Sequence, residues 1–265
     1  ALETRIHTPQ DILNATGIPS VSVLPVIGEY DTPDPALSAA FAHHLKAGKN
    51  DHGSVSKFLL DNPGSAEAEA LRGLYTTVML SQGGRPPQVM LVVSGSPGEG
   101  KTTIASNLAI ALAMRGPTCL VDADLRKGGV SRTFGLNPCS GLATVLSGSA
   151  EIPDVVTPVP EVPNLSVVPA GRADRNPGEL MSGALRERFE FVVFDSPPIL
   201  AYADGRVLST LVDGLIFVGR YGATTRAAIA KCMEMLSAIH AALILEVVLN
   251  GTSATADSAY YGQGY

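Results

Sequence analysis

The stretch VMLVVSGSPGEGKT, residues 89–102, decides the fold of this chain. Its first part, Val89–Val93, is an apolar run rich in valine, which is typical of a buried strand. Its second part, Gly95–Thr102, has the spacing Gly-x-x-x-x-Gly-Lys-Thr, whose backbone N–H groups surround phosphate oxygens and whose glycines leave that cradle open. We expect Lys101 at the outer phosphates and the Thr102 hydroxyl facing Mg²⁺. The loop residues predicted to bind nucleotide are Gly98, Glu99, Gly100, Lys101, Thr102 and Thr103.

The residues after the loop favour this interpretation. Ile104, Leu108 and Leu112 recur at every fourth position, which predicts an amphipathic helix. A glycine-rich surface turn with an incidental lysine is the alternative, and it requires neither the strand before nor the helix after. The strand, loop and helix together indicate a nucleotide-binding loop.

Two further apolar runs end in carboxylates. Cys119–Val121 is followed by Asp122 and Asp124, and Phe191–Phe194 is followed by Asp195. Strand ends of an open parallel sheet line the crevice where ligands bind, so these three aspartates are expected to converge on one phosphate-bound cation. The alternative is that Asp122 or Asp124 only caps the next segment, which explains one such aspartate better than three.

Apolar strands alternate with helical stretches through the chain, which predicts an α/β fold with a doubly wound, mostly parallel sheet flanked by helices. Near the N-terminus, Thr8, Pro9 and Asp11 predict a helix start and Gly17 its end, before an edge strand at Ser20–Val26. Residues 28–64 are expected to be a long exposed connection, followed by a helix over 65–80. Later strands should end near Asp122, Val168, Asp195, Val218 and Val248, with helices such as Asn176–Arg188 and Thr224–His240 between them.

Composition excludes several classes of protein. A net charge of −6 and a pI near 5.4 argue against nucleic-acid binding. No apolar run approaches the roughly 18 residues that cross a bilayer, so this fragment is expected to be soluble. The three cysteines, Cys119, Cys139 and Cys232, and the five histidines lack metal-site spacing, and the cysteines are expected to be reduced packing residues.

Together the three motifs resemble those of the bacterial protein-tyrosine kinases (BY-kinases), the cytoplasmic domains of exopolysaccharide co-polymerases or chain-length regulators. The motifs are Gly95–Thr102, Asp122–Arg126 and Asp195–Pro198, and the likeness runs from about Thr8 to the C-terminus. The resemblance implies a P-loop NTPase fold of the MinD/ParA-like branch. It also implies an ATP-dependent, Mg²⁺-requiring protein-tyrosine kinase that phosphorylates its own tail and regulates exopolysaccharide synthesis or export.

The resemblance also assigns roles to residues. Lys101, Asp122, Asp124 and Asp195 would be catalytic, and Thr102, Asp122 and Asp195 would hold the metal. Asp122 and Asp124 would orient the incoming tyrosine, and Asp122 is our preferred base. Arg126 would steady phosphate or the acceptor, with a solvated arginine as the alternative, and Asn250 would read the adenine.

The C-terminal tail carries the predicted phosphate acceptors. Tyr260, Tyr261 and Tyr265 are three of the seven tyrosines, and they lie among Gly, Ala, Ser and Gln without an apolar pattern that would dock them. Such a tail suits a segment that enters a neighbour's active site in trans. The alternative is a loose terminus that happens to contain aromatic residues.

The resemblance implies three regions and several partners. The three regions are residues 1–80, which include an oligomerisation helix, a kinase core over residues 81–250 and a flexible tail over residues 251–265. On that helix Glu69 and Arg72 match a ring-forming pattern, but Tyr75 replaces its second arginine, and an ordinary ion pair is the alternative. The first residue, Ala1, suggests a fragment of a longer chain. The implied partners are a second copy, a transmembrane activator segment and a tyrosine phosphatase, at the cytoplasmic face of the inner membrane.

Two rival functions stay open. A nucleotide-switch ATPase of the MinD/ParA type has a lysine five residues before the loop lysine, where this chain has Ser96. A catalytically idle nucleotide-binding module would not need Lys101, Asp122 and Asp195 together.

Overall fold

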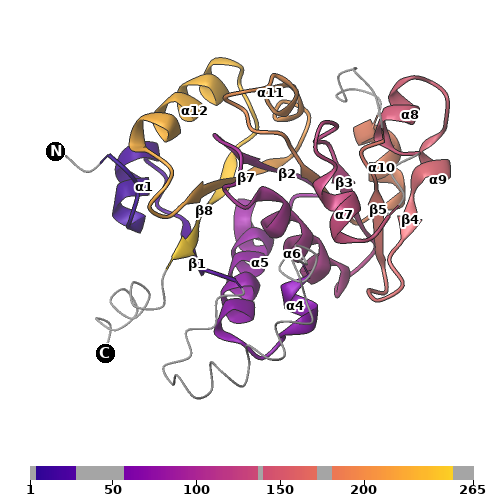
Figure 1. Cartoon of the computed structure of the whole chain (residues 1–265), viewed down its shortest axis with the longest axis horizontal. Coiled ribbons are helices and arrows are strands. Elements are labelled where there is room, and N and C mark those ends of the chain that lie inside the picture. The colour runs from indigo at the N-terminus through magenta and orange to yellow at the C-terminus, as the bar shows by residue number, and fades with distance from the viewer. Residues whose placement is uncertain (1–3, 28–56, 137–139, 172–180, 253–265) are drawn as a thin grey trace, which may run out of the picture.

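A central sheet organises the molecule. The computed structural model describes residues 4–27, 57–136, 140–171 and 181–252. Within them lies an eight-stranded sheet of order β1-β8-β7-β2-β6-β3-β5-β4 (Figure 1). All neighbouring strands are parallel except β4 and β5. The strands are β1 Val21–Pro25, β2 Val89–Ser94, β3 Thr118–Asp122, β4 Thr157–Pro158, β5 Leu165–Val168, β6 Phe191–Asp195, β7 Gly214–Arg220 and β8 Ile244–Thr252.

Helices cover both faces of this sheet, as expected for a doubly wound fold (Figure 1). On one face lie α4 (Phe58–Asp61), α5 (Ala66–Gly84) and α6 (Lys101–Ala113). The other face carries α1 (Pro9–Thr16), α8 (Leu142–Leu146), α9 (Ile152–Val155), α10 (Met181–Arg188), α11 (Asp204–Leu208) and α12 (Arg226–Ala238). The short helix α7 (Gly129–Thr133) follows β3.

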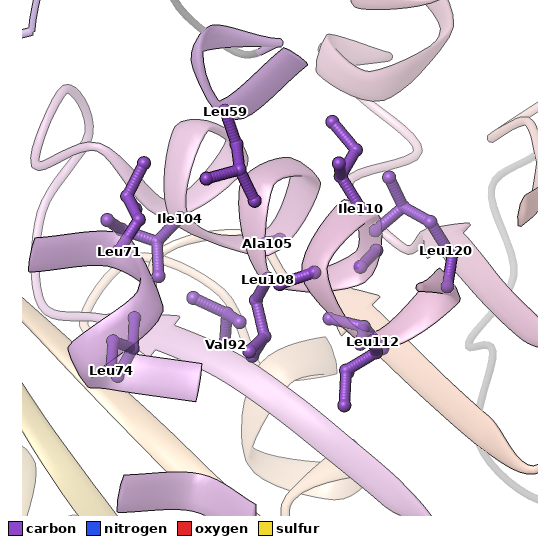
Figure 2. Packing of buried hydrophobic residues seen from close by; sticks show 14 of the residues in the cluster. Leu59, Leu71, Leu74, Val92, Ile104, Ala105, Leu108, Ile110, Leu112 and Leu120 are labelled. Carbon is purple, nitrogen blue, oxygen red and sulfur yellow. The ribbon is translucent and has the colours of Figure 1, made fainter. Parts of the chain in front are cut away.

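Alternation along β2 divides the core into two layers. Met90 and Val92 pack on the α6 side, whereas Val89, Leu91 and Val93 pack on the α12 side. All five side chains are fully buried, as a central strand covered on both faces requires. Figure 2 shows the first layer, where Leu71 and Leu74 of α5 point toward α6 and Val92 lies beneath Leu108.

The helix predicted from Ile104, Leu108 and Leu112 is confirmed, but its predicted amphipathic character is wrong. Helix α6 exists, but residues 104–113 are all buried. The reason is that α4 and α5 cover the side of α6 that faces away from the sheet (Figure 2). Its small residues, such as Ala105 and Ala109, allow this close approach on every side.

The predicted exposed connection over 28–64 is wrong at its end. Residues 28–56 lie outside the described part of the chain, but Phe58 and Leu59 are 4% and 2% exposed. The Leu59 amide donates to the Asn107 side chain of α6 at 2.9 Å. Two apolar side chains and one buried hydrogen bond therefore anchor α4 against α6.

The predicted N-terminal elements are confirmed. Thr8 accepts from the amide of Asp11 in a capping box, and Gly17 ends α1 with a positive φ of 72°. Strand β1 lies at the sheet edge beside β8, and Ser65 caps α5, which loses helical geometry from Ser81 onward. Of the predicted helix over 176–188, residues 176–180 lie outside the described residues. Among the residues that the structure describes, no helix combines the length and apolarity that a bilayer span needs.

Candidate active site

The glycine-rich loop joins the end of β2 to the first turn of α6, at the carboxyl edge of the sheet where ligands bind in such folds. Gly100 has a φ of 103°, and a Cβ there would lie 2.0 Å from Asn250 Nδ2. The backbone conformation therefore favours glycine, and a Cβ would also displace the side-chain amide of Asn250 from the loop. The amides that follow, at the N-terminus of α6, are suited to bind an anion.

Lys101 lies within this loop and is 7% exposed. Its Nζ donates to Ser94 Oγ at 2.9 Å. Burial lowers the pKa of Lys101, and the carboxylates of Asp195, Glu99 and Asp124 oppose that shift. The ammonium group is thus held close to the place where the loop would receive phosphates.

The predicted convergence of aspartates is observed for Asp122 and Asp195. Strands β3 and β6 are neighbours, and these two residues are direct partners in their register. Both side chains are at most 1% exposed. Thr102 Oγ1 donates to Asp195 Oδ2 at 2.6 Å, which connects the first turn of α6 to the carboxylate pair.

Each carboxylate has an oxygen without a hydrogen-bond partner. Among the described residues, the buried side-chain atoms with no partner include Oδ1 of Asp122 and Oδ1 of Asp195. Unpaired buried oxygens of this kind are costly, and they fit a divalent cation that takes oxygen ligands. The Thr102 hydroxyl is a third oxygen at the same place. The donor set therefore fits Mg²⁺.

The protonation of the pair reflects its burial. Burial first, and then the charge of Asp195, raises the pKa of Asp122 to about 8. Burial also raises the pKa of Asp195, to about 6, although the Thr102 hydrogen bond and the Lys101 charge act in the opposite direction. Two carboxylates this close resist simultaneous ionisation in the absence of a cation.

The capping alternative accounts for part of this geometry. Asp122 Oδ2 accepts from the amides of Val130 at 3.0 Å and Ser131 at 3.3 Å, in the first turn of α7. Asp124 Oδ1 accepts from the amides of Arg126 and Lys127, both at 3.3 Å. Capping thus occupies one oxygen of each aspartate and leaves Asp122 Oδ1 unexplained. In the described part of the chain, no group of three or more His, Cys, Asp or Glu side chains is arranged to hold a metal alone.

The remaining predicted nucleotide residues have different surroundings. Asn250, in β8, donates from Nδ2 to the carbonyl of Glu99 at 3.0 Å, so it lies against the loop. The Glu99 side chain is buried and bonded to Thr224 and to the amide of Ser96. Sequence reasoning misses Thr224, because it is 125 positions from Glu99 and no local pattern marks the contact.

The oligomerisation candidates form an ion pair within α5. Arg72 Nη2 lies 2.7 Å from Glu69 Oε2, and Arg72 Nη1 donates to the carbonyl of Pro63 at 2.8 Å. Tyr75 packs partly buried against the core. The three acceptor candidates Tyr260, Tyr261 and Tyr265 lie outside the described residues.

Arg126 lies just beyond Asp124, and its side chain contacts two residues in the described part of the chain. It pairs with Asp204 and lies over the Tyr202 ring, with its guanidinium carbon 4.2 Å from the ring centroid. Tyr202 is 36% exposed, so Arg126 and Tyr202 form a partly exposed stack.

Comparisons with known proteins identify similar sequences. No family model matches the chain. It is 33% identical to the tyrosine-protein kinase YwqD of Bacillus subtilis over 214 residues, which cover 77% of this chain and 90% of that relative. It is 30% identical to the tyrosine-protein kinase CpsD of Streptococcus agalactiae over 208 residues, 74% of this chain and 90% of the relative. The putative tyrosine-protein kinase EpsB of Ralstonia solanacearum matches all of this chain at 28% identity, over 35% of its own length.

Solved structures with the same fold include kinase domains. The BceF tyrosine kinase domain superposes with a TM-score of 0.72 at 27% identity, over 93% of this chain and 99% of that domain. The kinase domain of Escherichia coli ETK has a TM-score of 0.76 at 23% identity, which supports the fold alone. The Pyrococcus furiosus cell-division ATPase MinD superposes less well, with a TM-score of 0.55 at 26% identity over 66% of this chain.

Proposed function

The chain belongs to the bacterial tyrosine-protein kinases, and from that premise we propose that it transfers the γ-phosphoryl group of ATP to its own C-terminal tyrosines, in trans. The proposed acceptors are Tyr260, Tyr261 and Tyr265 of a second copy. The observation that carries the proposal is the buried pair Asp122 and Asp195, side by side at the loop that holds Lys101.

Each residue of this site receives a distinct role. The loop amides and Lys101 bind and orient the phosphates, since phosphoryl transfer depends mainly on positioning and on neutralised charge. Thr102, Asp195 and Asp122 would hold Mg²⁺ through their side-chain oxygens. When bound, Mg²⁺ supplies positive charge to the phosphate oxygens.

The acceptor tyrosine would approach Asp122 and Asp124. Asp122 accepts the phenolic proton as the phenolic oxygen bonds to the γ-phosphorus and the bond from that phosphorus to the bridging oxygen of ADP breaks, so that ADP leaves; Asp124 orients the hydroxyl. A tyrosine hydroxyl has an ordinary pKa of about 10, so an aspartate acts on it late, as negative charge leaves the phenolic oxygen. Asn250 is proposed to read the adenine from the end of β8.

Charge on the tail is the proposed link to polysaccharide synthesis or export, the process that the resemblance implies. Each phosphate adds about −1.5 to −2 charges near neutral pH, which repels neighbouring acidic copies and loosens an assembly. Glu69 and Arg72 are proposed contacts in that assembly, although they pair within one helix here. The proposed partners are a transmembrane activator and a tyrosine phosphatase, at the cytoplasmic face of the membrane.

The proposal is tested by incubating the chain with γ-labelled ATP and Mg²⁺ and following both labelled tyrosine and released phosphate. Labelled tail tyrosines in the wild type, and none in Lys101→Met, support the kinase. Hydrolysis without label would instead indicate a nucleotide-switch ATPase, which the MinD-like fold makes the relevant rival. Nucleotide binding without hydrolysis or label would indicate an idle module.

A further inference from the structure

The backbone carbonyls of the glycine-rich loop point to partners outside the predicted phosphate cradle. Five residues of the loop each accept a hydrogen bond at their backbone carbonyl oxygen. The donors are Leu200 to Gly95, Ser94 to Ser96, Arg220 to Gly98, Asn250 to Glu99, and Ile104 to Gly100. Carbonyl oxygens repel phosphate oxygens, so a working cradle needs them turned away. Two of the donors, Arg220 and Asn250, come from β7 and β8 rather than from the loop's own neighbours.

The Glu99 side chain is fixed from the same side. It is 4% exposed, and its Oε2 accepts from the amide of Ser96 at 2.7 Å, which closes the loop on itself. Its Oε1 accepts from the hydroxyl of Thr224. This carboxylate therefore carries its negative charge beside a loop that must receive a nucleotide with several negative charges.

Thr224 is itself held rigidly. It is 5% exposed, and its hydroxyl accepts from the amide of Arg220 at 2.8 Å while donating to Glu99. Its own amide donates to the carbonyl of Arg220 at 2.9 Å, which closes the turn after β7. The carbonyl of Thr224 accepts from the amide of Ile6, and the amide of Gly222 donates to the carbonyl of Ile6, both at 2.9 Å, so the N-terminal segment fixes this turn.

We propose that Thr224 is a positioning residue for nucleotide binding, acting through Glu99. Its hydroxyl keeps the Glu99 carboxylate turned away from the phosphates and bonded to Ser96, so that the loop is preformed for an anion. Without that hydroxyl, the buried carboxylate loses one of its two partners and is free to turn toward the cradle, where like charges repel. The inference rests on the nucleotide site proposed above, and it does not depend on which tyrosines accept phosphate.

The test compares three variants by titrating the full chain with a fluorescent ADP analogue in excess Mg²⁺. Thr224→Val removes the hydroxyl at constant shape, and it should weaken binding about tenfold, or about 1.4 kcal/mol. Thr224→Ser keeps the hydroxyl and should retain most of the wild-type affinity for the ADP analogue. Thr225→Ala is the matched control, because Thr225 caps α12 through the amide of Ala228. It should lower thermal stability and leave ADP affinity unchanged.

A fourth variant separates loss of positioning from general loosening. Adding Glu99→Gln to Thr224→Val removes the displaced negative charge, so the double variant should bind more tightly than Thr224→Val alone. The inference is overturned if Thr224→Val binds as the wild type does, if Thr225→Ala weakens binding equally, or if the double variant regains nothing. Failure of the wild type to bind ADP would instead overturn the nucleotide site of the proposed function.

Discussion

Asp122 and Asp195 are direct register partners on the adjacent parallel strands β3 and β6, and each has a buried Oδ1 without a hydrogen-bond partner in the described structure. Such a pair destabilises a protein without a cation, because burial and mutual repulsion both disfavour the charged forms. The pair therefore lowers the stability of the folded chain, as functional groups at active sites commonly do. Its consequences can be measured in the absence of nucleotide.

The first prediction concerns pH. Both folded-state pKa values, about 8 for Asp122 and about 6 for Asp195, lie above the ordinary value of 3.8. The folded state therefore binds more protons than the unfolded chain, and the free energy of unfolding contributed by the pair falls as pH rises through this window. In EDTA, Asp122→Asn should gain stability over the wild type from about pH 4 toward pH 8, as measured by urea unfolding.

Asp213 supplies a control of opposite sign. Burial raises the pKa of Asp213. Two hydrogen bonds from Arg186, at 2.7 and 2.8 Å, and further hydrogen bonds from backbone amides lower it by more, so the net shift of the pKa is downward. Its contribution is present above the unfolded pKa and is lost as pH falls through the folded value. Asp213→Asn should therefore lose stability relative to the wild type only as pH rises toward the ordinary pKa of 3.8, and its deficit should stay constant from about pH 4 to pH 8. The account of Asp122 is wrong if both variants show the same slope.

The second prediction concerns the cation. Mg²⁺ with ADP at about one hundred times its dissociation constant should stabilise the wild type by about 2.7 kcal/mol, which appears as a rise in melting temperature. Thr102→Ala and Asp195→Asn should each show a smaller rise, because each removes an oxygen of the proposed Mg²⁺ site. An equal rise in all three proteins would place the cation elsewhere.

The third prediction concerns Gly100. Gly100→Ala should unfold more easily and lose ADP binding, because alanine at a φ of 103° is strained and its Cβ would meet Asn250. Gly73→Ala in α5 is the matched control, since no atom lies within 4 Å of the place that a Cβ would take there. It should stabilise the protein by about 0.4 to 1 kcal/mol. If Gly100→Ala bound ADP as tightly as the wild type does, the close approach of the loop to Asn250 would not matter for nucleotide binding.

The fourth prediction concerns α4. Leu59→Ala should cost about 2 to 5 kcal/mol of unfolding free energy, because the side chain is 2% exposed and packs toward α6 (Figure 2). Leu80→Ala, at a residue 69% exposed, should change stability by less than about 0.5 kcal/mol. Similar costs at the two positions would contradict the packing of α4.

The parts of the fold that could be predicted are those with local signals. Val89–Thr102 specifies a strand, a loop and a helix start within fourteen positions, and Thr8 with Gly17 marks both ends of α1. The sequence could also place Asp122 and Asp195 at strand ends, because each follows an apolar run. Their meeting then follows from the parallel topology.

The parts that could not be predicted depend on packing between distant segments. Helix α6 has apolar residues at a spacing of four, but its burial on all sides depends on α4 and α5, which come earlier in the chain. The Glu99 contact with Thr224 depends on the closed turn after β7, and a lone threonine gives no signal for it. From the sequence, Glu69 and Arg72 could either join subunits or form an ordinary ion pair within one helix. The structure of a single copy contains that ion pair.

The central claim is that one copy phosphorylates the tail of another through the site at Lys101. The most direct measurement mixes a Lys101→Met chain with an intact tail and an active chain whose Tyr260, Tyr261 and Tyr265 are phenylalanine, with ATP and Mg²⁺. Mass spectrometry then locates phosphate on each chain. The account predicts phosphotyrosine on the tail of the Lys101→Met chain. An unmodified tail, in a mixture where the active chain still consumes ATP, would contradict it.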